Sequence, residues 1–372
     1  INVPAPSGVS PQMMTLVLND PIKPDGTLDE FYNPMYSVTP WTFQYYPGST
    51  SYLDTPLVPL SAFAPADVKL DTDPNNTPVI FSLDGPAPGF GPVIDLAGGT
   101  ITLQSKGLTS IINPAYDPNT LGSQFRVNRD FGFGNVQGQV LLNDVPLAIN
   151  SWTDAQIQAT VPAGAATGRI SVVRGDNLNP TDVGVTLHVV NLATTPIRYV
   201  AADGTGDFLT IQAAIDAASP GDLILVAPAL YNENVIMNKP VRLQGSGSGG
   251  TTIFGYPNPA EKLMEWHNRI NALGPAGYIE LNLADAFGAN EAPAIIVIGE
   301  IDSGGTIINP GYPFSDLDPA MIDGFSCSGS KAGGGIYAAM GASNLTISNN
   351  HVTGNQGNSG GGIAIGYRNA NF

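Results

Sequence analysis

The chain has 372 residues, of which 42% are hydrophobic and 12% are charged, so it is long enough for two or three domains with apolar cores. Its 14 Lys and Arg against 31 Asp and Glu give a net charge of −17, which argues against nucleic acids, anionic membranes and acidic polymers as partners. The single cysteine, Cys327, excludes an internal disulfide bond, and no apolar run reaches the roughly 20 residues of a membrane span.

Residues 1–76 are rich in proline and aromatic residues, and we expect them to form an extended arm. Prolines disfavour helices and central strands, so the aromatic side chains are expected to pack on a neighbouring domain or chain. The alternative is a sugar-stacking platform of Trp41, Tyr45 and Tyr46, because aromatic ring faces suit the C–H faces of sugars.

Residues 77–191 predict a β-sandwich of the immunoglobulin-like type, because short alternating strands are separated by glycine, proline and asparagine turns. We expect a turn at Asn143-Asp144. The predicted strands are 77–83, 98–103, 139–142, 145–147, 152–164, 168–173 and 183–190.

Four short motifs in this region resemble the TIG family of immunoglobulin-like domains. They are Gly132-Phe-Gly134, Val145-Pro146, Trp152-Thr-Asp154 and Val161-Pro-Ala-Gly164. The resemblance implies a spacer or binding module rather than an enzyme. The chain departs from the pattern between about 107 and 131, where an insertion rich in Asn and Pro is expected to lengthen a loop.

The region 197–372 opens with a strand, a glycine turn and a short amphipathic helix. Thr210 is expected to cap this helix, and Pro220-Gly221 to end it. Its apolar face is Ile211, Ala214, Ile215 and Ala218. Short strands are then predicted at 223–226, 235–236, 241–243 and 252–254.

This order, with the segment Asp203-Gly-Thr-Gly-Asp-Phe208, resembles the entry of a right-handed parallel β-helix of the pectin-lyase-like and pectinesterase-like kind. In that family the short helix covers the open N-terminal end of the solenoid, which implies the same role here. We therefore expect a mostly β chain, with the sandwich followed by a right-handed parallel β-helix over 197–372.

A helical insertion is predicted at about 258–292. Asn258, Pro259 and Glu261 are a favourable helix start, and Gly274 is a suitable stop. The apolar positions Leu263, Trp266, Ile270 and Leu273 recur at helical spacing. Strands are expected to resume at 294–298 and 306–308.

An internal repeat follows, because the segment 322–329 aligns with 347–354 at a shift of 25 residues. Each copy is followed by Gly-Gly-Gly-Ile, at 333–336 and 360–363. In this register Cys327 aligns with Val352, which predicts a small core residue rather than a nucleophile. Asn349, Asn350 and Asn355 are expected in stacked turns.

No catalytic or cofactor-binding residue is carried over from the resemblance. Pectinesterase-like enzymes use a pair of aspartates and an arginine on later coils, and no matching segments follow residue 245. A Ca²⁺ site is considered at Asp316, Asp318 and Asp323, since carboxylates two residues apart face one side of a strand; an Asx-turn explains the first two equally well.

We therefore expect a non-catalytic structural or adhesive protein at the cell surface or outside the cell, similar in composition to secreted bacterial surface proteins. Other protein chains, or a further C-terminal part of the same protein, are the expected partners, because no capping helix closes the predicted solenoid after residue 366. Two alternatives stay open: a pectate-lyase-like or pectinesterase-like enzyme with catalytic coils beyond residue 372, and a polysaccharide-binding module.

Overall fold

The computed structural model describes residues 12–20, 23, 27, 29–33, 36–45, 73–86, 90–115, 121–256, 260–273, 292–299, 320–330, 333–339, 342, 344–357 and 360–366. The chain divides into two compact units, Ile1–Thr72 and Asp73–Phe372. In the first unit β1 (Gln12–Leu18) and β2 (Thr39–Tyr45) pair antiparallel, with Pro40 opposite Val17. Both strands of a two-stranded sheet are edges, where proline is tolerated, so the proline at residue 40 is compatible with the pairing.

The second unit begins with two sheets that face each other across one apolar core. One sheet has the order β10-β11-β5-β3 and the other the order β4-β13-β12-β8-β9. Their strands are β3 (Ile80–Asp84), β4 (Val93–Asp95), β5 (Gly99–Ser105), β8 (Gln139–Leu142), β9 (Val145–Pro146), β10 (Ala148–Trp152), β11 (Gln156–Val161), β12 (Gly168–Val173) and β13 (Val185–Val190). Asn143 and Asp144 adopt positive φ values of 50° and 63° between β8 and β9, so the predicted turn is confirmed.

Two predicted features of this region differ from the structure. The segment expected as one strand over 152–164 is two strands, because the Thr153 side chain hydroxyl accepts a hydrogen bond from Gln156 N and stabilises a turn between β10 and β11. The insertion at 107–131 is not only a loop: β6 (Gly107–Ile112) and β7 (Arg126–Phe131) pair antiparallel along their full length.

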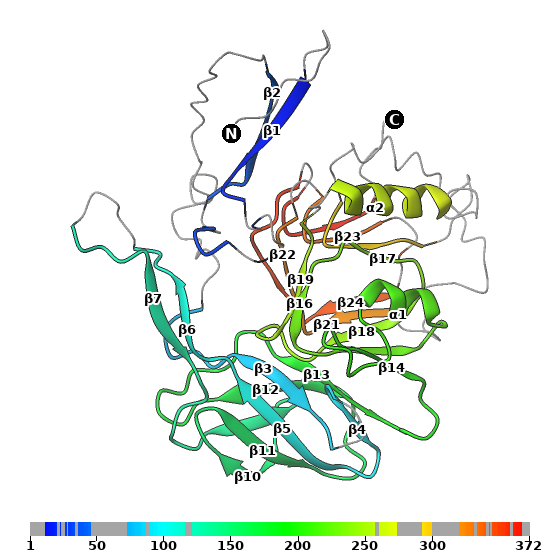
Figure 1. Ribbon diagram of the computed structural model, residues 1–372. Coiled ribbons are helices and arrows are strands. Elements are labelled where there is room, and N and C mark those ends of the chain that lie inside the picture. Colours follow the sequence, from blue (N-terminus) through cyan, green and yellow to red (C-terminus); the bar gives the residue numbers. More distant parts are fainter. Residues whose placement is uncertain are drawn as a thin grey trace. The chain divides into compact units, whose positions relative to one another are not determined.

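The remaining strands form a parallel β-helix with three sheets, in which each strand pairs with the equivalent strand one coil later (Figure 1). The first sheet contains β14 (Ile197–Val200), β15 (Leu223–Val226), β18 (Arg242–Gly245), β21 (Ala320–Asp323) and β24 (Leu345–Ser348). The second contains β16 (Ala229–Tyr231), β19 (Thr251–Phe254), β22 (Ser326–Ser328) and β25 (His351–Val352). The third contains β17 (Val235–Met237), β20 (Ile295–Val297), β23 (Ile336–Ala338) and β26 (Ile363–Ile365).

The 25-residue repeat register is confirmed by the strand pairing. Ile322 lies opposite Ile347, and Cys327 lies opposite Val352. The asparagines of the last coil bridge successive turns, since Asn350 accepts from Phe325 N, and Asn355 accepts from Ser330 N. The 25-residue repeat and the asparagine hydrogen bonds between turns therefore indicate the same stacking of successive coils.

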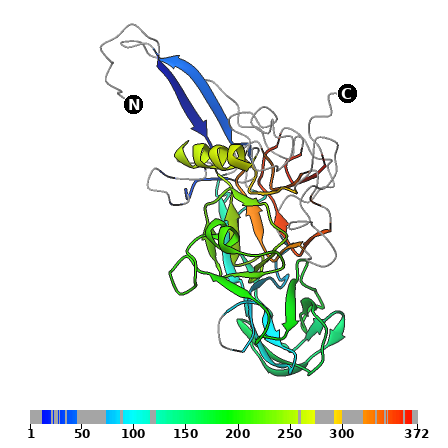
Figure 2. The same ribbon diagram turned by 90° about the vertical axis from the view of Figure 1, so that its right-hand side faces the viewer.

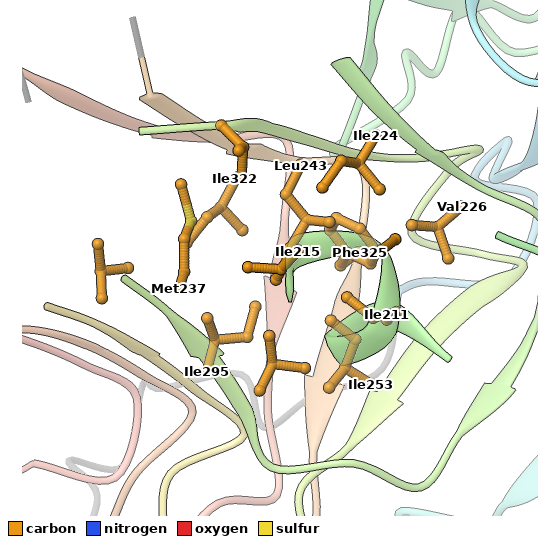
Figure 3. Close-up of a cluster of buried hydrophobic side chains, with 14 of the residues drawn as sticks. Ile211, Ile215, Ile224, Val226, Met237, Leu243, Ile253, Ile295, Ile322 and Phe325 are labelled. Atoms are coloured by element: carbon orange, nitrogen blue, oxygen red, sulfur yellow. The ribbon is translucent and has the colours of Figure 1, made fainter. Parts of the chain in front are cut away.

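The interior of the β-helix is a continuous apolar core. Figure 3 shows Ile224, Leu243 and Ile322 from the first sheet near Ile253 of the second and Ile295 of the third. Cys327 belongs to this core and is fully buried, so its prediction as a core residue is confirmed.

Burial raises the pKa of the Cys327 thiol to about 12, so the thiol is expected to stay protonated and unreactive in the folded chain. A thiolate-specific reagent will leave the native protein unlabelled and will label it stoichiometrically after denaturation, because the thiolate is the reactive form. Labelling is followed by mass spectrometry with and without urea. Rapid stoichiometric labelling of the folded chain would contradict the buried position.

Helix α1 (Ile211–Ala217) adds three buried side chains, Ile211, Ala214 and Ile215, to the same core. The Thr210 side chain caps it by accepting from Ala213 N. At its other end Lys239 Nζ donates to three carbonyl oxygens of residues 215, 216 and 218. The helix is therefore capped at its first turn and bonded to the coil at its last turn.

Helix α2 (Ala260–Leu273) lies between β19 and β20 and is the predicted insertion. Its apolar positions Trp266 and Ile270 pack on the outer face of the third sheet, against Ile236, Ile296 and Tyr337. Figures 1 and 2 show this helix outside the three sheets, so the coil continues beneath it. The predicted start residues Asn258 and Pro259, the stop Gly274 and the strand at 306–308 lie outside the described residues.

The glycine-rich loop between β18 and β19 has a packing function. Gly249 N donates to Ile80 O at 3.1 Å, and Ser246 O accepts from Leu83 N at 2.8 Å, so the loop lies along β3 of the first pair of sheets. A Cβ at residue 249 would be 2.6 Å from Ile80 O. Only glycine permits this approach of two backbones.

Substituting Gly249 by Ala is therefore expected to lower the free energy of unfolding by about 1–3 kcal/mol, since neither backbone is free to yield without losing these bonds. Gly362→Ala is the matched control, because a Cβ at residue 362 has no neighbour within 4 Å. Urea denaturation of both variants measures the effect. Equal loss in the two variants would show that close approach is not the cause.

Candidate functional site

The outer face of the first β-helix sheet carries a row of polar side chains in register. Gln244, Asp323 and Ser348 occupy equivalent positions on β18, β21 and β24. Strand β13 covers this row through Thr186 and His188. We call these five residues, with Asn349, the polar seam.

Asp323 is the centre of the polar seam and is fully buried. Its Oδ1 accepts from Thr186 N at 2.9 Å and from Gln244 Nε2 at 2.8 Å. Its Oδ2 accepts from Thr186 Oγ1 and Ser348 Oγ, both at 2.7 Å, and from Asn349 Nδ2 at 2.6 Å. Five donors compensate for the removal of this carboxylate from water.

His188 joins the polar seam through Gln244. Its Nε2 lies 2.9 Å from Gln244 Oε1, which is an acceptor because Gln244 Nε2 donates to Asp323. Nε2 therefore carries the proton in the neutral ring. Burial lowers the pKa of His188 to about 4, and the nearby Arg242 acts in the same direction.

Apolar contacts continue this interface beside the polar seam. Leu223 and Leu225 of β15 pack with Val93 of β4 and Val190 of β13. The Phe90 and Tyr199 rings meet edge to face, with centroids 5.2 Å apart. A substrate polymer has no direct access to Gln244 or Asp323, since both side chains are fully buried beneath β13.

The predicted site residues are only partly described. Asp316, Asp318 and Tyr46 lie outside the described residues, and Trp41 and Tyr45 are placed in β2 by their backbone alone. Asp323 is surrounded by hydrogen-bond donors rather than by other carboxylates. Within the described ranges, no group of three or more His, Cys, Asp or Glu side chains is arranged to hold a metal ion.

Sequence reasoning did not connect Thr186, His188 and Gln244 with Asp323. The sequence did carry a signal for Asp323 and Ser348, because the 25-residue register aligns them at a non-core position of the repeat. No pattern relates β13 to β21, which are 137 residues apart at the Thr186–Asp323 bond. Among the described helices, none is long and apolar enough to cross a bilayer.

Comparison with known proteins gives short sequence matches to pectinesterases. No family model matches the chain. It is 49% identical over 59 residues to "Probable pectinesterase/pectinesterase inhibitor 17" of Arabidopsis thaliana, which is 15% of this chain and 12% of that protein. It is 31% identical over 109 residues to "Pectinesterase 1" of the same plant, covering 27% of this chain and 19% of that protein.

Solved structures that match this chain include two enzymes that act on pectic polymers by their titles. The pectin methylesterase from carrot has 16% identity and a TM-score of 0.25, with 42% of this chain and 39% of that chain covered. The family 28 exopolygalacturonase of Yersinia enterocolitica has 10% identity and a TM-score of 0.20, with 77% and 61% covered. The chain spans less than a fifth of the curated relatives it matches. The parallel β-helix is established by its own strand register, and the sequence of the chain is locally similar to those of pectinesterases.

Proposed function

We propose that this chain is a non-catalytic structural protein of the cell surface or extracellular space, in which the β-helix is a rigid scaffold. The observation that supports this most directly is the polar seam. A carboxylate on the outer face of the first sheet is a group that acid–base chemistry on a polysaccharide would use, and a neighbouring amide is a donor that would stabilise developing negative charge. Here both are hydrogen-bonded to the neighbouring sheets and closed to solvent.

The paired sheets of residues 80–190 are the second component of the proposed scaffold. We assign them to the TIG type of immunoglobulin-like domain, which has a spacer or binding role. Their bonds to β18 and β21 couple them mechanically to the β-helix, as a scaffold requires. A polysaccharide-stacking role for Trp41, Tyr45 and Tyr46 is a separate proposal, which the scaffold role does not require.

The last coil exposes apolar side chains that another polypeptide segment could cover. Ile363 and Ile365 of β26 are 47% and 80% exposed, whereas Ile336, one coil earlier, is fully buried. Exposed apolar side chains beside a strand edge favour further pairing. We propose that another protein chain or a further part of this one covers this end.

A carbohydrate-active enzyme is the second candidate, and the local identity to two pectinesterases favours it. In that case the catalytic residues would lie on a part of the chain other than the polar seam, whose Gln244 and Asp323 side chains are closed to solvent.

An activity assay separates the two candidates. The purified chain is incubated with methylated pectin and with polygalacturonate, with and without Ca²⁺, and methanol and unsaturated products are measured. We expect no turnover in any condition. Methanol or unsaturated product from the purified chain would overturn the proposal.

A further inference from the structure

A cleft of about 280 Å³ lies beside the β-helix, away from the polar seam. Its walls come from three elements: the first turn of α1, the turn between β16 and β17, and the face of α2 directed toward α1. The cleft exists because the insertion places α2 beside the coil. Two contacts hold the helix there, the Lys262 Nζ to Asn232 O bond of 2.6 Å and the Arg269–Asp216 ion pair of 2.8 Å.

The floor of the cleft is built from groups that are already bonded. Glu233 accepts from Ile211 N and Gln212 N with its two oxygens, at 2.9 and 3.0 Å. The Gln212 amide is bonded to Asp216 and to both backbone groups of Ile236. These side chains fix α1 on the coil, so the floor is rigid.

The wall formed by α2 carries basic side chains with hydrogen-bond donors that can contact a ligand. Lys262 and Arg269 have N–H groups beyond those bonded to Asn232 and Asp216. They stand two helical turns apart, about 10 Å along the axis, and the exposed Glu265 lies between them. Trp266 is buried and forms part of the wall, so stacking on its ring does not provide the recognition.

The charged side chains that line the cleft are two acidic and two basic residues, so the cleft as a whole favours neither anions nor cations. An anion attracted by Lys262 or Arg269 is repelled by Glu233 and Glu265. A cation attracted by these two carboxylates is repelled by the two basic side chains. Burial raises the pKa of the Glu233 carboxyl and lowers that of the Lys262 ammonium, which is consistent with a poorly hydrated site. Hydroxyl groups suit it, because each accepts from an ammonium or guanidinium and donates to a carboxylate.

We propose that this cleft binds a neutral carbohydrate through its hydroxyl groups, with Lys262, Glu265 and Arg269 as the recognition residues. The volume lies just below the range of about 300–1,000 Å³ typical of drug-sized ligands, so one or two sugar rings are expected. This site is independent of the polar seam and of the scaffold proposal.

The test is a titration of the whole chain with cellobiose, maltose and lactose, followed by ligand-observed NMR and calorimetry. Galacturonate and glucosamine are the charged comparators. At least one neutral disaccharide is expected to bind with millimolar affinity, and more tightly than either comparator. Glu265→Gln and Arg269→Gln are each expected to weaken binding about tenfold, since each loses a charge-assisted hydrogen bond.

Glu261→Gln is the matched control, because Glu261 is exposed on the first turn of the same helix and does not line the cleft. It is expected to bind as the unsubstituted chain does. All three positions are exposed, so circular dichroism should show intact folding. Absence of binding by every neutral sugar, tighter binding of a charged comparator, or unchanged affinity in both cleft variants would overturn the proposal.

Discussion

Replacing Asp323 by alanine is expected to lower the free energy of unfolding by about 3 kcal/mol and to uncouple the paired sheets from the β-helix. The substitution removes the common acceptor of five donors. Buried donors left without acceptors cost about 1–3 kcal/mol each, and those that reach water cost less. Urea denaturation followed by tryptophan fluorescence measures the change.

Two tryptophans report the two sides of the interface separately. Trp152 lies in β10 and Trp266 in α2, so Trp41→Phe with either Trp266→Phe or Trp152→Phe isolates one signal. The parent transitions should coincide, whereas those of Asp323→Ala should separate. Asp323→Asn is the control for volume, because it keeps the shape but places an N–H₂ group against donors. If Asn is tolerated like the native residue, cavity formation rather than hydrogen bonding explains the loss.

Acidification is expected to destabilise the chain through His188. The pKa of His188 is about 4 in the folded chain against an ordinary value of 6.5. Above pH 6.5 the ring is neutral in both states. As the pH falls from 6.5 toward 4 the unfolded chain binds the proton first, so stability is lost over this window. The full difference corresponds to about 3 kcal/mol.

The measurement compares the native chain with His188→Gln by urea denaturation between pH 7.5 and pH 4 (values about one unit apart). Gln retains an N–H donor for Gln244, and all other titrating groups are common to both chains. The native chain should lose stability more steeply, and His267→Gln, on α2, serves as the control for removing a histidine elsewhere. Parallel profiles for the native chain and His188→Gln would rule out His188 as the cause.

Local sequence patterns predicted most of the β-helix because its contacts are periodic. A residue and its equivalent one coil later share the same core position, so Ile322 with Ile347 and Cys327 with Val352 were identified from spacing alone. The cap at Thr210 and the apolar face of α2 were likewise readable, because helix caps and amphipathic periodicity are local.

The ribbon formed by β6 and β7 was not predicted, since its pairing depends on cross-strand neighbours rather than on turn residues. The glycine-rich loop at 245–250 could be recognised as a turn, but its contact with β3 is a long-range contact.

The sequence by itself determined the periodic features of this protein: short strands, a repeat of 25 residues, and one helix inserted between coils. Only the tertiary structure decided which polar residues meet. Asp323 and Thr186 are 137 residues apart, and Lys262 lines its cleft with Gln212 only because α2 folds back on α1. The physical reason is that a periodic core constrains each residue through neighbours at a fixed spacing, whereas a polar interface between distant strands has no spacing to reveal it.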